Sequence, residues 1–186
     1  MRRRRRKRHL KSFAQAEWMI RHGVGKRLFR WLRKKPALCA RLDGFGLLHQ
    51  AAWGKRYDVV AWLLRHGVHP DIGPTGNNSA LIHAASENDV RLINLLLDAG
   101  ADIEYCNFSL ETPLGYACSW NAVDAVRVLC ERGANLNGTE GWGHSHLWCV
   151  QCAIPRDETG KQRAIEQILL AHGAEVIEEP PKLPWP

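Results

Sequence analysis

Apolar residues recur with helical spacing in three successive stretches of the chain. Within each stretch they lie at positions i, i+3, i+6 and i+7, which places them on one side of an α-helix. Each stretch therefore predicts a helix that buries one side against a neighbour. The three apolar sides consist of Tyr57, Val60, Leu63 and Leu64, then Val90, Ile93, Leu96 and Leu97, and then Val123, Val126, Leu129 and Cys130.

A segment rich in small residues precedes each of these helices, and small side chains let two helices approach closely. A glycine follows each apolar helix and is expected to end it with a left-handed backbone. Both features recur at one constant interval, so the chain is predicted to repeat a pair of helices. The matched alanines are Ala51, Ala84 and Ala117, and the matched glycines are Gly67, Gly100 and Gly133.

A fourth copy of the unit is longer than the others. It ends in LLAHGAEVI, and its glycine, Gly173, lies further from Gly133 than one period of the repeat. The additional residues fall within residues 154–163, a polar stretch containing Gly and Pro. This stretch predicts a lengthened loop between the two helices of the last unit.

Several segments of the repeat resemble ankyrin repeats. TPLGYA at residues 112–117 matches the TPLHxA motif of that family, while AGADIE and RGANLN match the end of its unit. The resemblance covers about residues 13–177, or five units, and the outer units diverge most. It implies an all-α ankyrin solenoid of stacked helix-turn-helix units joined by β-turn loops.

The repeat and the resemblance together predict the organisation of the chain. No run of 18 or more apolar residues predicts a membrane span. We expect a disordered basic tail at residues 1–11, a divergent N-terminal ankyrin-like unit at 12–42, repeats at 43–74, 75–107 and 108–140, a divergent C-terminal repeat at 141–177 with its inserted loop at 154–163, and a Pro-rich tail at 178–186.

Charge is distributed unevenly along the chain. Residues 1–41 carry a net charge of +15, whereas residues 42–186 carry −8. A basic block of this kind indicates a nuclear-localisation-like address, a patch for nucleic acid or anionic lipid, or a solubilising tail. It is not a signal peptide, because no apolar segment follows it. The block consists of Arg2, Arg3, Arg4, Arg5, Arg6, Lys7 and Arg8.

The segment GHSHLWCVQCA at residues 143–153 raises the question of cysteine chemistry. Cys149 and Cys152 have the spacing of a redox dithiol, and together with His144 and His146 they also suggest a zinc site. Aligned on the preceding repeats, both cysteines fall inside the first helix of the last unit, without the strand-to-helix turn that a thioredoxin-like site needs. Thiols packed as small hydrophobic groups are therefore favoured, with zinc as the alternative.

Catalytic motifs are absent from the sequence. Phosphate-binding loops, nucleophile elbows, HExxH helices and deaminase signatures are not found, so neither enzyme activity nor a cofactor is expected. Six widely spaced cysteines without an export signal predict reduced thiols and a cytoplasmic protein, with a nuclear location open in a eukaryotic cell.

The resemblance also implies where a partner binds, because ankyrin proteins bind with their turn tips and with the exposed side of each first helix. At these positions the chain carries unusually many aromatic residues, which either anchor a protein partner or pack against neighbouring repeats. We expect a monomeric adaptor, inhibitor or toxin-immunity protein whose acidic surroundings favour a basic or mixed partner surface. The expected binding residues are Phe45, Trp53, Glu87, Tyr105, Phe108, Glu111, Trp120, Trp142 and His144.

Overall fold

The computed structural model describes residues 44–71, 78–138, 145–154 and 158–176, together with Arg30, Arg33 and Lys34. Eight helices lie in this part of the chain, which contains no strand, and the predicted all-α class is confirmed. None of these helices is both long and apolar enough to cross a membrane. They are α4 (Gly44–Trp53), α5 (Tyr57–Arg65), α6 (Ala80–Ser86), α7 (Val90–Asp98), α8 (Pro113–Ser119), α9 (Val123–Glu131), α10 (His146–Ala153) and α11 (Lys161–Ala171).

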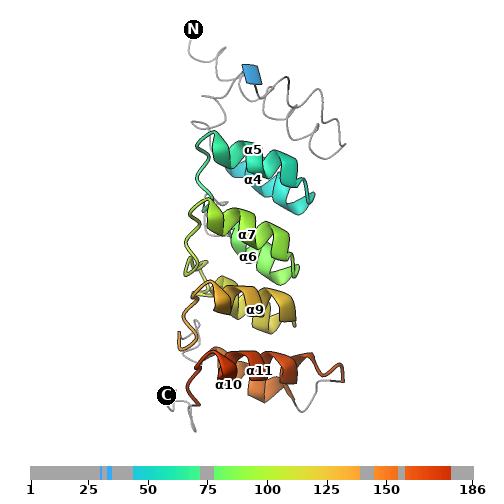
Figure 1. Cartoon of the computed structure of the whole chain (residues 1–186), viewed down its shortest axis with the longest axis vertical. Helices are drawn as coiled ribbons and strands as arrows, with labels where there is room; N and C mark the ends of the chain where they lie inside the picture. Colours follow the sequence, from blue (N-terminus) through green and yellow to red (C-terminus); the bar gives the residue numbers. More distant parts are fainter. Residues whose placement is uncertain are drawn as a thin grey trace.

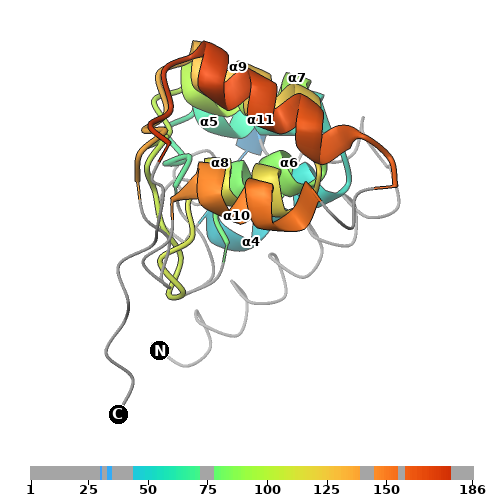
Figure 2. The same cartoon turned by 90° about the horizontal axis from the view of Figure 1, so that it is seen from below.

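The helices form two layers. The first helices of the pairs (α4, α6, α8 and α10) make one layer and the second helices (α5, α7, α9 and α11) the other, and the pairs stack along the long axis (Figure 1, Figure 2). The loops that join the pairs run along one side of the stack (Figure 1). Leu63, Leu96 and Leu129, which share one place on the predicted apolar sides, are fully buried between the layers. Burial of each such leucine contributes about 1.5–3 kcal/mol to folding.

The first helices of the last three units begin at hydroxyl caps in matching positions of the repeat. The side chains of Ser79, Thr112 and Ser145 accept hydrogen bonds from the backbone N–H three residues further on, at 3.3, 3.2 and 3.3 Å. Each cap satisfies an N–H that the helix itself leaves unpaired. The alignment of the divergent last unit with the third repeat is therefore seen in the structure as well.

Left-handed residues end both helices of the first three described units, whereas the C-cap of α10, Ile154, is right-handed. The predicted glycine caps are confirmed, with φ of 83° at Gly67, 85° at Gly100 and 87° at Gly133. The N–H after each glycine donates to the carbonyl five residues earlier, at 3.2 Å for the first cap. A second left-handed set was not expected from the sequence. It occupies the turn between the two helices of a unit and comprises Lys55, Asn88 and Asn121.

The inserted stretch of the last unit ends earlier than expected. Helix α11 begins at Lys161, so residues 161–163, expected within the loop 154–163, form its first turn. Gly160 provides the left-handed residue before the helix, with φ of 73°. Gln162 is buried in this turn, and packing against the stack therefore extends the helix into a polar sequence.

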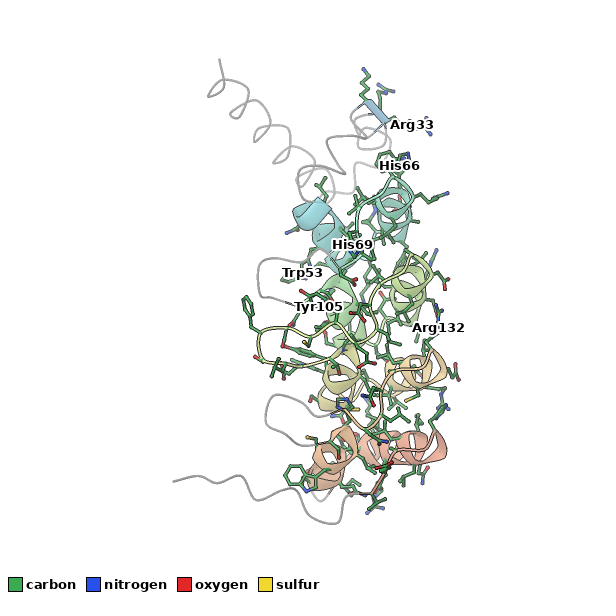
Figure 3. All side chains as sticks on the ribbon, turned by 90° about the vertical axis from the view of Figure 1, so that its left-hand side faces the viewer. Arg33, Trp53, His66, His69, Tyr105 and Arg132 are labelled. Atoms are coloured by element: carbon green, nitrogen blue, oxygen red, sulfur yellow. The ribbon has the colours of Figure 1, made fainter. Side chains whose placement is uncertain are left out.

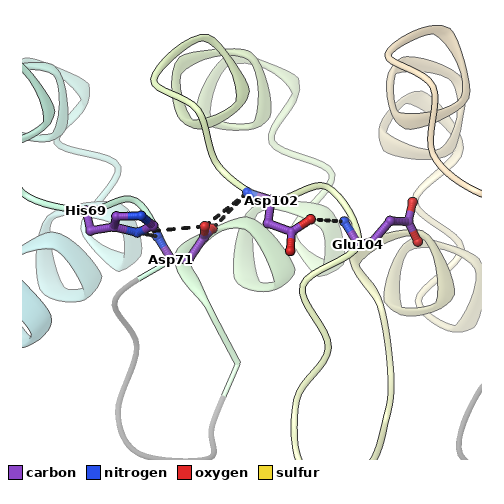
Figure 4. A network of polar contacts seen from close by, with 4 residues as sticks. All are labelled: His69, Asp71, Asp102 and Glu104. Atoms are coloured by element: carbon purple, nitrogen blue, oxygen red, sulfur yellow. Dashed lines mark hydrogen bonds and ion pairs between the residues drawn. The ribbon is translucent and has the colours of Figure 1, made fainter.

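A repeated hydrogen bond ties the loops of successive units together. The carboxylate of Asp71 accepts from the N–H of Asp102 at 3.1 and 3.0 Å, and Oε1 of Glu104 accepts from the N–H of Asn135 at 2.7 Å. Figure 4 shows the first of these links, in which Asp102 in turn accepts from the N–H of Glu104 at 2.9 Å. The loops are thus fixed relative to one another along the stack.

The same type of link continues into the last unit. Oδ1 of Asn137 accepts from the N–H of Glu175 at 2.9 Å. The three acceptors, Asp71, Glu104 and Asn137, occupy matching positions in successive units. We call this series the loop ladder.

Candidate partner-binding face

Large apolar side chains are exposed where loops and turns adjoin the first helices. Phe108 and Leu110, in the loop before α8, are 82% and 57% exposed. Trp53 ends α4 and Trp120 follows α8, at 66% and 65% exposed. Figure 3 shows Trp53 on the side of the first helices and Arg132 on the side of the second helices. We call Trp53, Phe108, Leu110 and Trp120 the apolar face.

Trp53 packs against two imidazoles. Its ring centroid lies 6.4 Å from that of His49 in the same helix and 5.8 Å from that of His83 in the next unit, and the two imidazoles are 6.0 Å apart. Burial lowers the pKa of His49 and of His83 below the ordinary value, so both rings are mostly neutral at pH 7. Trp53 therefore packs between units on one side while most of its ring stays open to a partner.

The loop before α8 is organised by a side chain that the sequence did not single out. Asn107 is buried, and its Oδ1 accepts from the N–H of Ser109 at 2.9 Å and of Glu111 at 3.0 Å. Its Nδ2 donates at 2.9 Å to Oδ1 of Asn78, which lies in the loop before α6. The available signal was the tendency of Asn to bond the backbone two residues further on and so to form turns.

The tip of this loop keeps an apolar residue in an unfavourable conformation. Leu110 has φ of 59°, in the left-handed region that costs a residue with a Cβ about 1–2 kcal/mol. Its N–H donates to the carbonyl of Asn107 at 2.9 Å, which closes the turn. The turn holds Phe108 and Leu110 outward, so the exposure of both side chains follows from the loop's own hydrogen bonds.

The two predicted glutamates lie beside the apolar face. Glu87 caps the end of α6, and its Oε2 lies 3.9 Å from Nζ of Lys55. Both side chains are about half exposed, so the ion pair leaves Glu87 accessible. Glu111 is half-buried, and its Oε2 accepts from Nδ2 of Asn107 at 3.2 Å.

Of the remaining predicted binding residues, the structure describes the side chains of only some. Tyr105 is half-buried in the loop, on the side of the first helices (Figure 3). Phe45 belongs to α4, but its side chain lies outside the described part of the structure. Trp142, His144 and the basic block from Arg2 to Arg8 also lie outside the described residues. Phe108 and Trp120 make no ring contact with another described aromatic side chain.

The cysteine pair lies within α10. Cys149 is half-buried and Cys152 is exposed, and His146 is buried at the first residue of the helix. Across the described residues, no three His, Cys, Asp or Glu side chains gather in a way that suits a metal ion. The fourth residue of the alternative zinc site, His144, lies outside them. The described geometry thus brings no ligand set together around the two thiols.

Comparison with known proteins agrees with the repeat seen in the structure. Residues 48–140, half of the chain, match a family model described as ankyrin repeats in three copies. The chain is also 32% identical over 101 residues to an ankyrin repeat protein of Rickettsia bellii (strain RML369-C). The aligned region covers 51% of this chain and 29% of the relative.

Two further relatives show a similar partial match. An ankyrin repeat protein of fowlpox virus (strain NVSL) is 28% identical over 105 residues, covering 55% of this chain and 14% of the relative. Ankyrin repeat and SOCS box protein 11 of Danio rerio is 32% identical over 100 residues, covering 54% of this chain and 34% of the relative. The chain spans about a third or less of the length of these relatives. With its repeated helix pairs, caps and turns, the chain belongs to the ankyrin repeat family.

Proposed function

We propose that this chain is a non-catalytic binding module that holds a protein partner on its apolar face. Ankyrin repeats generally mediate protein–protein interaction and are generally not enzymes. The observation that carries the proposal is the position of the exposed apolar side chains. Four of the six large ones in the described residues belong to the apolar face. The other two, Leu170 and Val176, lie in and after α11.

The chemistry of these side chains suits an interface. Trp and Phe bury large areas with few rotatable bonds, and aromatic anchors contribute most of the binding energy in many interfaces. Trp53 is already held by His49 and His83, and Phe108 by the turn around Asn107. Because the Trp53 ring and the backbone that carries Phe108 are fixed before binding, less conformational entropy is lost when a partner covers them.

Replacing two anchors tests the proposal. Trp53→Ala combined with Trp120→Ala should weaken partner capture at least about 30-fold, which corresponds to the 2 kcal/mol of a hot spot. Helical content and melting temperature should stay close to wild type, because both side chains are mostly exposed. The measurement is recovery of bound proteins from native lysate by mass spectrometry, followed by affinity measurement with the recovered partner.

Leu170→Ala is the matched control, since Leu170 is an exposed apolar residue on α11. It should retain the proteins that the Trp double variant loses. Normal capture by a folded double variant would contradict the proposal.

The biological setting is also part of the proposal. The module acts as an adaptor, an inhibitor or a toxin-immunity protein, as a monomer in the cytoplasm. Size-exclusion chromatography with light scattering checks the monomer, because a stable dimer would cover part of the surface offered to a partner.

A second function is favoured by the charge of residues 1–41. We propose that Arg2 to Arg8 tether the chain to nucleic acid or to an anionic surface. Deletion of residues 2–11 should abolish binding to DNA, RNA or vesicles containing anionic lipid, and binding by the intact chain should fall steeply with salt. Unchanged binding after the deletion would reduce this segment to a solubilising tail.

A further inference from the structure

We infer that the partner presents a short basic segment to the apolar face, with a Lys or Arg side chain at Glu87 between Trp53 and Trp120. The inference rests on the proposed function and specifies its partner. It is carried by three observations on the described residues, which concern the charge on this side of the stack, the order of three side chains along it, and the competing Lys55.

Charge in the loops and turns beside the first helices is mostly acidic, although the turn after α4 carries Lys55 and Arg56. Within their bounds, α4, α6, α8 and α10 contain no Asp, Glu, Lys or Arg. The charges on this side therefore come from loops and turns. The loop over residues 99–112 contains three carboxylates and no Lys or Arg. These carboxylates are Asp102, Glu104 and Glu111.

Charge on the second-helix side is balanced. Within their bounds, α5, α7, α9 and α11 carry five basic and five acidic residues. The acidic excess therefore coincides with the side that exposes the apolar face. A partner with complementary charge is basic, because opposite potentials favour encounter and like charges oppose it. The same acidic side argues against nucleic acid as the occupant, since its phosphates would be repelled.

Three side chains are arranged in order along the stack. Trp53, Glu87 and Trp120 stand at or directly after the ends of α4, α6 and α8, in three successive units. Packed helices lie about 8–10 Å apart, so the two Trp residues are about 20 Å apart with Glu87 between them. An extended segment of about six residues spans that distance. A cation at its centre would meet the carboxylate, and apolar or cationic side chains on either side would meet the indole rings.

Lys55 provides an internal test of this arrangement. Its Nζ lies 3.9 Å from Oε2 of Glu87, with both side chains about half exposed. A cation of the partner at Glu87 has to share or displace this contact. Removal of Lys55 should therefore strengthen binding of a basic segment, whereas binding through apolar contact alone would be indifferent to the change.

The experiment uses a phage-displayed pool of randomised twelve-residue peptides, selected on the full-length chain. Only peptides whose binding is lost in the Trp53→Ala, Trp120→Ala double variant are retained, which removes peptides that bind the basic N-terminal residues. We expect the retained peptides to be enriched in Lys and Arg. Their affinities are then measured by isothermal titration for single variants at low and high salt.

The expected changes differ in sign between variants. Glu87→Gln should weaken a retained peptide about threefold at low salt, and Lys55→Gln should strengthen it about threefold, with both effects shrinking at high salt. Glu131→Gln is the matched control, because Glu131 is an exposed glutamate at the end of α9, on the second-helix side. It should leave the affinity unchanged.

The outcomes separate this inference from the proposed function. The basic segment is contradicted if the retained peptides are neutral or acidic, or if their affinity is the same for Glu87→Gln, Lys55→Gln and the wild type. The apolar face would then remain a binding site, but not one for a basic segment. Failure to retain any peptide also overturns the short segment, while loss of lysate proteins in the Trp double variant still tests the module itself. If peptides bind the apolar face only after deletion of residues 2–11, the occupant is the chain's own basic block, and the partner assignment is overturned.

Discussion

At the scale of single residues, the two imidazoles beside Trp53, those of His49 and His83, should make the stability of the fold depend on pH. Burial lowers the pKa of His49 and of His83, so each ring takes up a proton less readily in the folded chain than in the unfolded chain. Above the ordinary pKa of 6.5 both rings are neutral in either state and the folded chain keeps its full stability. As the pH falls below 6.5, the unfolded chain takes up protons first, and the folded chain loses stability relative to it. Mild acid should therefore weaken the first two described units.

The corresponding prediction concerns the acid limb of the stability curve. His49→Gln combined with His83→Gln should melt with a smaller loss between pH 7 and pH 5 than the wild type, because the glutamines take up no proton. Thermal unfolding followed by circular dichroism across this range measures the effect. An equal loss in both proteins would show that other groups cause the acid sensitivity.

The period of the repeat predicted part of this residue-scale picture. It assigned both Trp53 and Trp120 to the exposed sides of first helices, whereas the structure places Trp53 at the end of α4 and Trp120 directly after α8. The contact of Trp53 with His49 and His83 was not foreseen, because it depends on how side chains from two units meet. Which unit supplies a neighbour follows from the repeat, but which rotamer it adopts does not.

The loop before α8 determines exposure at the scale of an element. Its turn is built around Asn107, whose amide bonds two backbone N–H groups and the side chain of Asn78. The register of the repeat predicts Phe108 in a turn. It does not identify Asn107, because the residues before the TPLGYA motif diverge from one unit to the next. The importance of this amide appears only when the loop closes around it.

Asn107→Ala should destabilise the chain by about 1–3 kcal/mol, since it removes the acceptor of two part-buried N–H groups. The loop should also open locally, so chymotrypsin should cleave after Phe108 or Leu110 faster than in the wild type. Urea unfolding and timed proteolysis measure the two effects. Phe108→Ala is the comparison, because an 82% exposed ring should leave stability nearly unchanged. Slow cleavage in Asn107→Ala would contradict the assigned role.

The loop ladder extends over the whole molecule. In a stack of repeats each unit contacts only its neighbours, so stability depends on every interface between units. At each of three interfaces the ladder joins a backbone N–H of one unit to a side-chain oxygen of the unit before it, and the acceptors are Asp71, Glu104 and Asn137. The period of the repeat predicted the stack itself. The sequence did not predict the loop ladder, because its acceptors are three different residue types, Asp, Glu and Asn, that have only a side-chain oxygen in common.

Comparison of Asp71 with Asn137 shows whether an acceptor of the loop ladder needs a negative charge. Burial raises the pKa of this carboxyl, against the opposing effect of the hydrogen bond from Asp102. A raised pKa means that the partly buried charge costs stability as the pH rises above the ordinary value of 3.8. At the same place in the third repeat the neutral amide of Asn137 makes the same bond at 2.9 Å. An uncharged acceptor is therefore sufficient for the ladder.

Two variants of Asp71 should therefore differ in stability. At pH 7, Asp71→Asn should be at least as stable as the wild type, because it keeps an acceptor for the N–H of Asp102 and removes a partly buried charge. Asp71→Ala should lose about 1 kcal/mol with the acceptor. Urea unfolding at pH 7 and pH 4 measures both, and the advantage of Asn over Asp should shrink toward the lower pH as the carboxyl takes up its proton. An Asn variant as unstable as the Ala variant would show that the link to Asp102 needs the negative charge of Asp71.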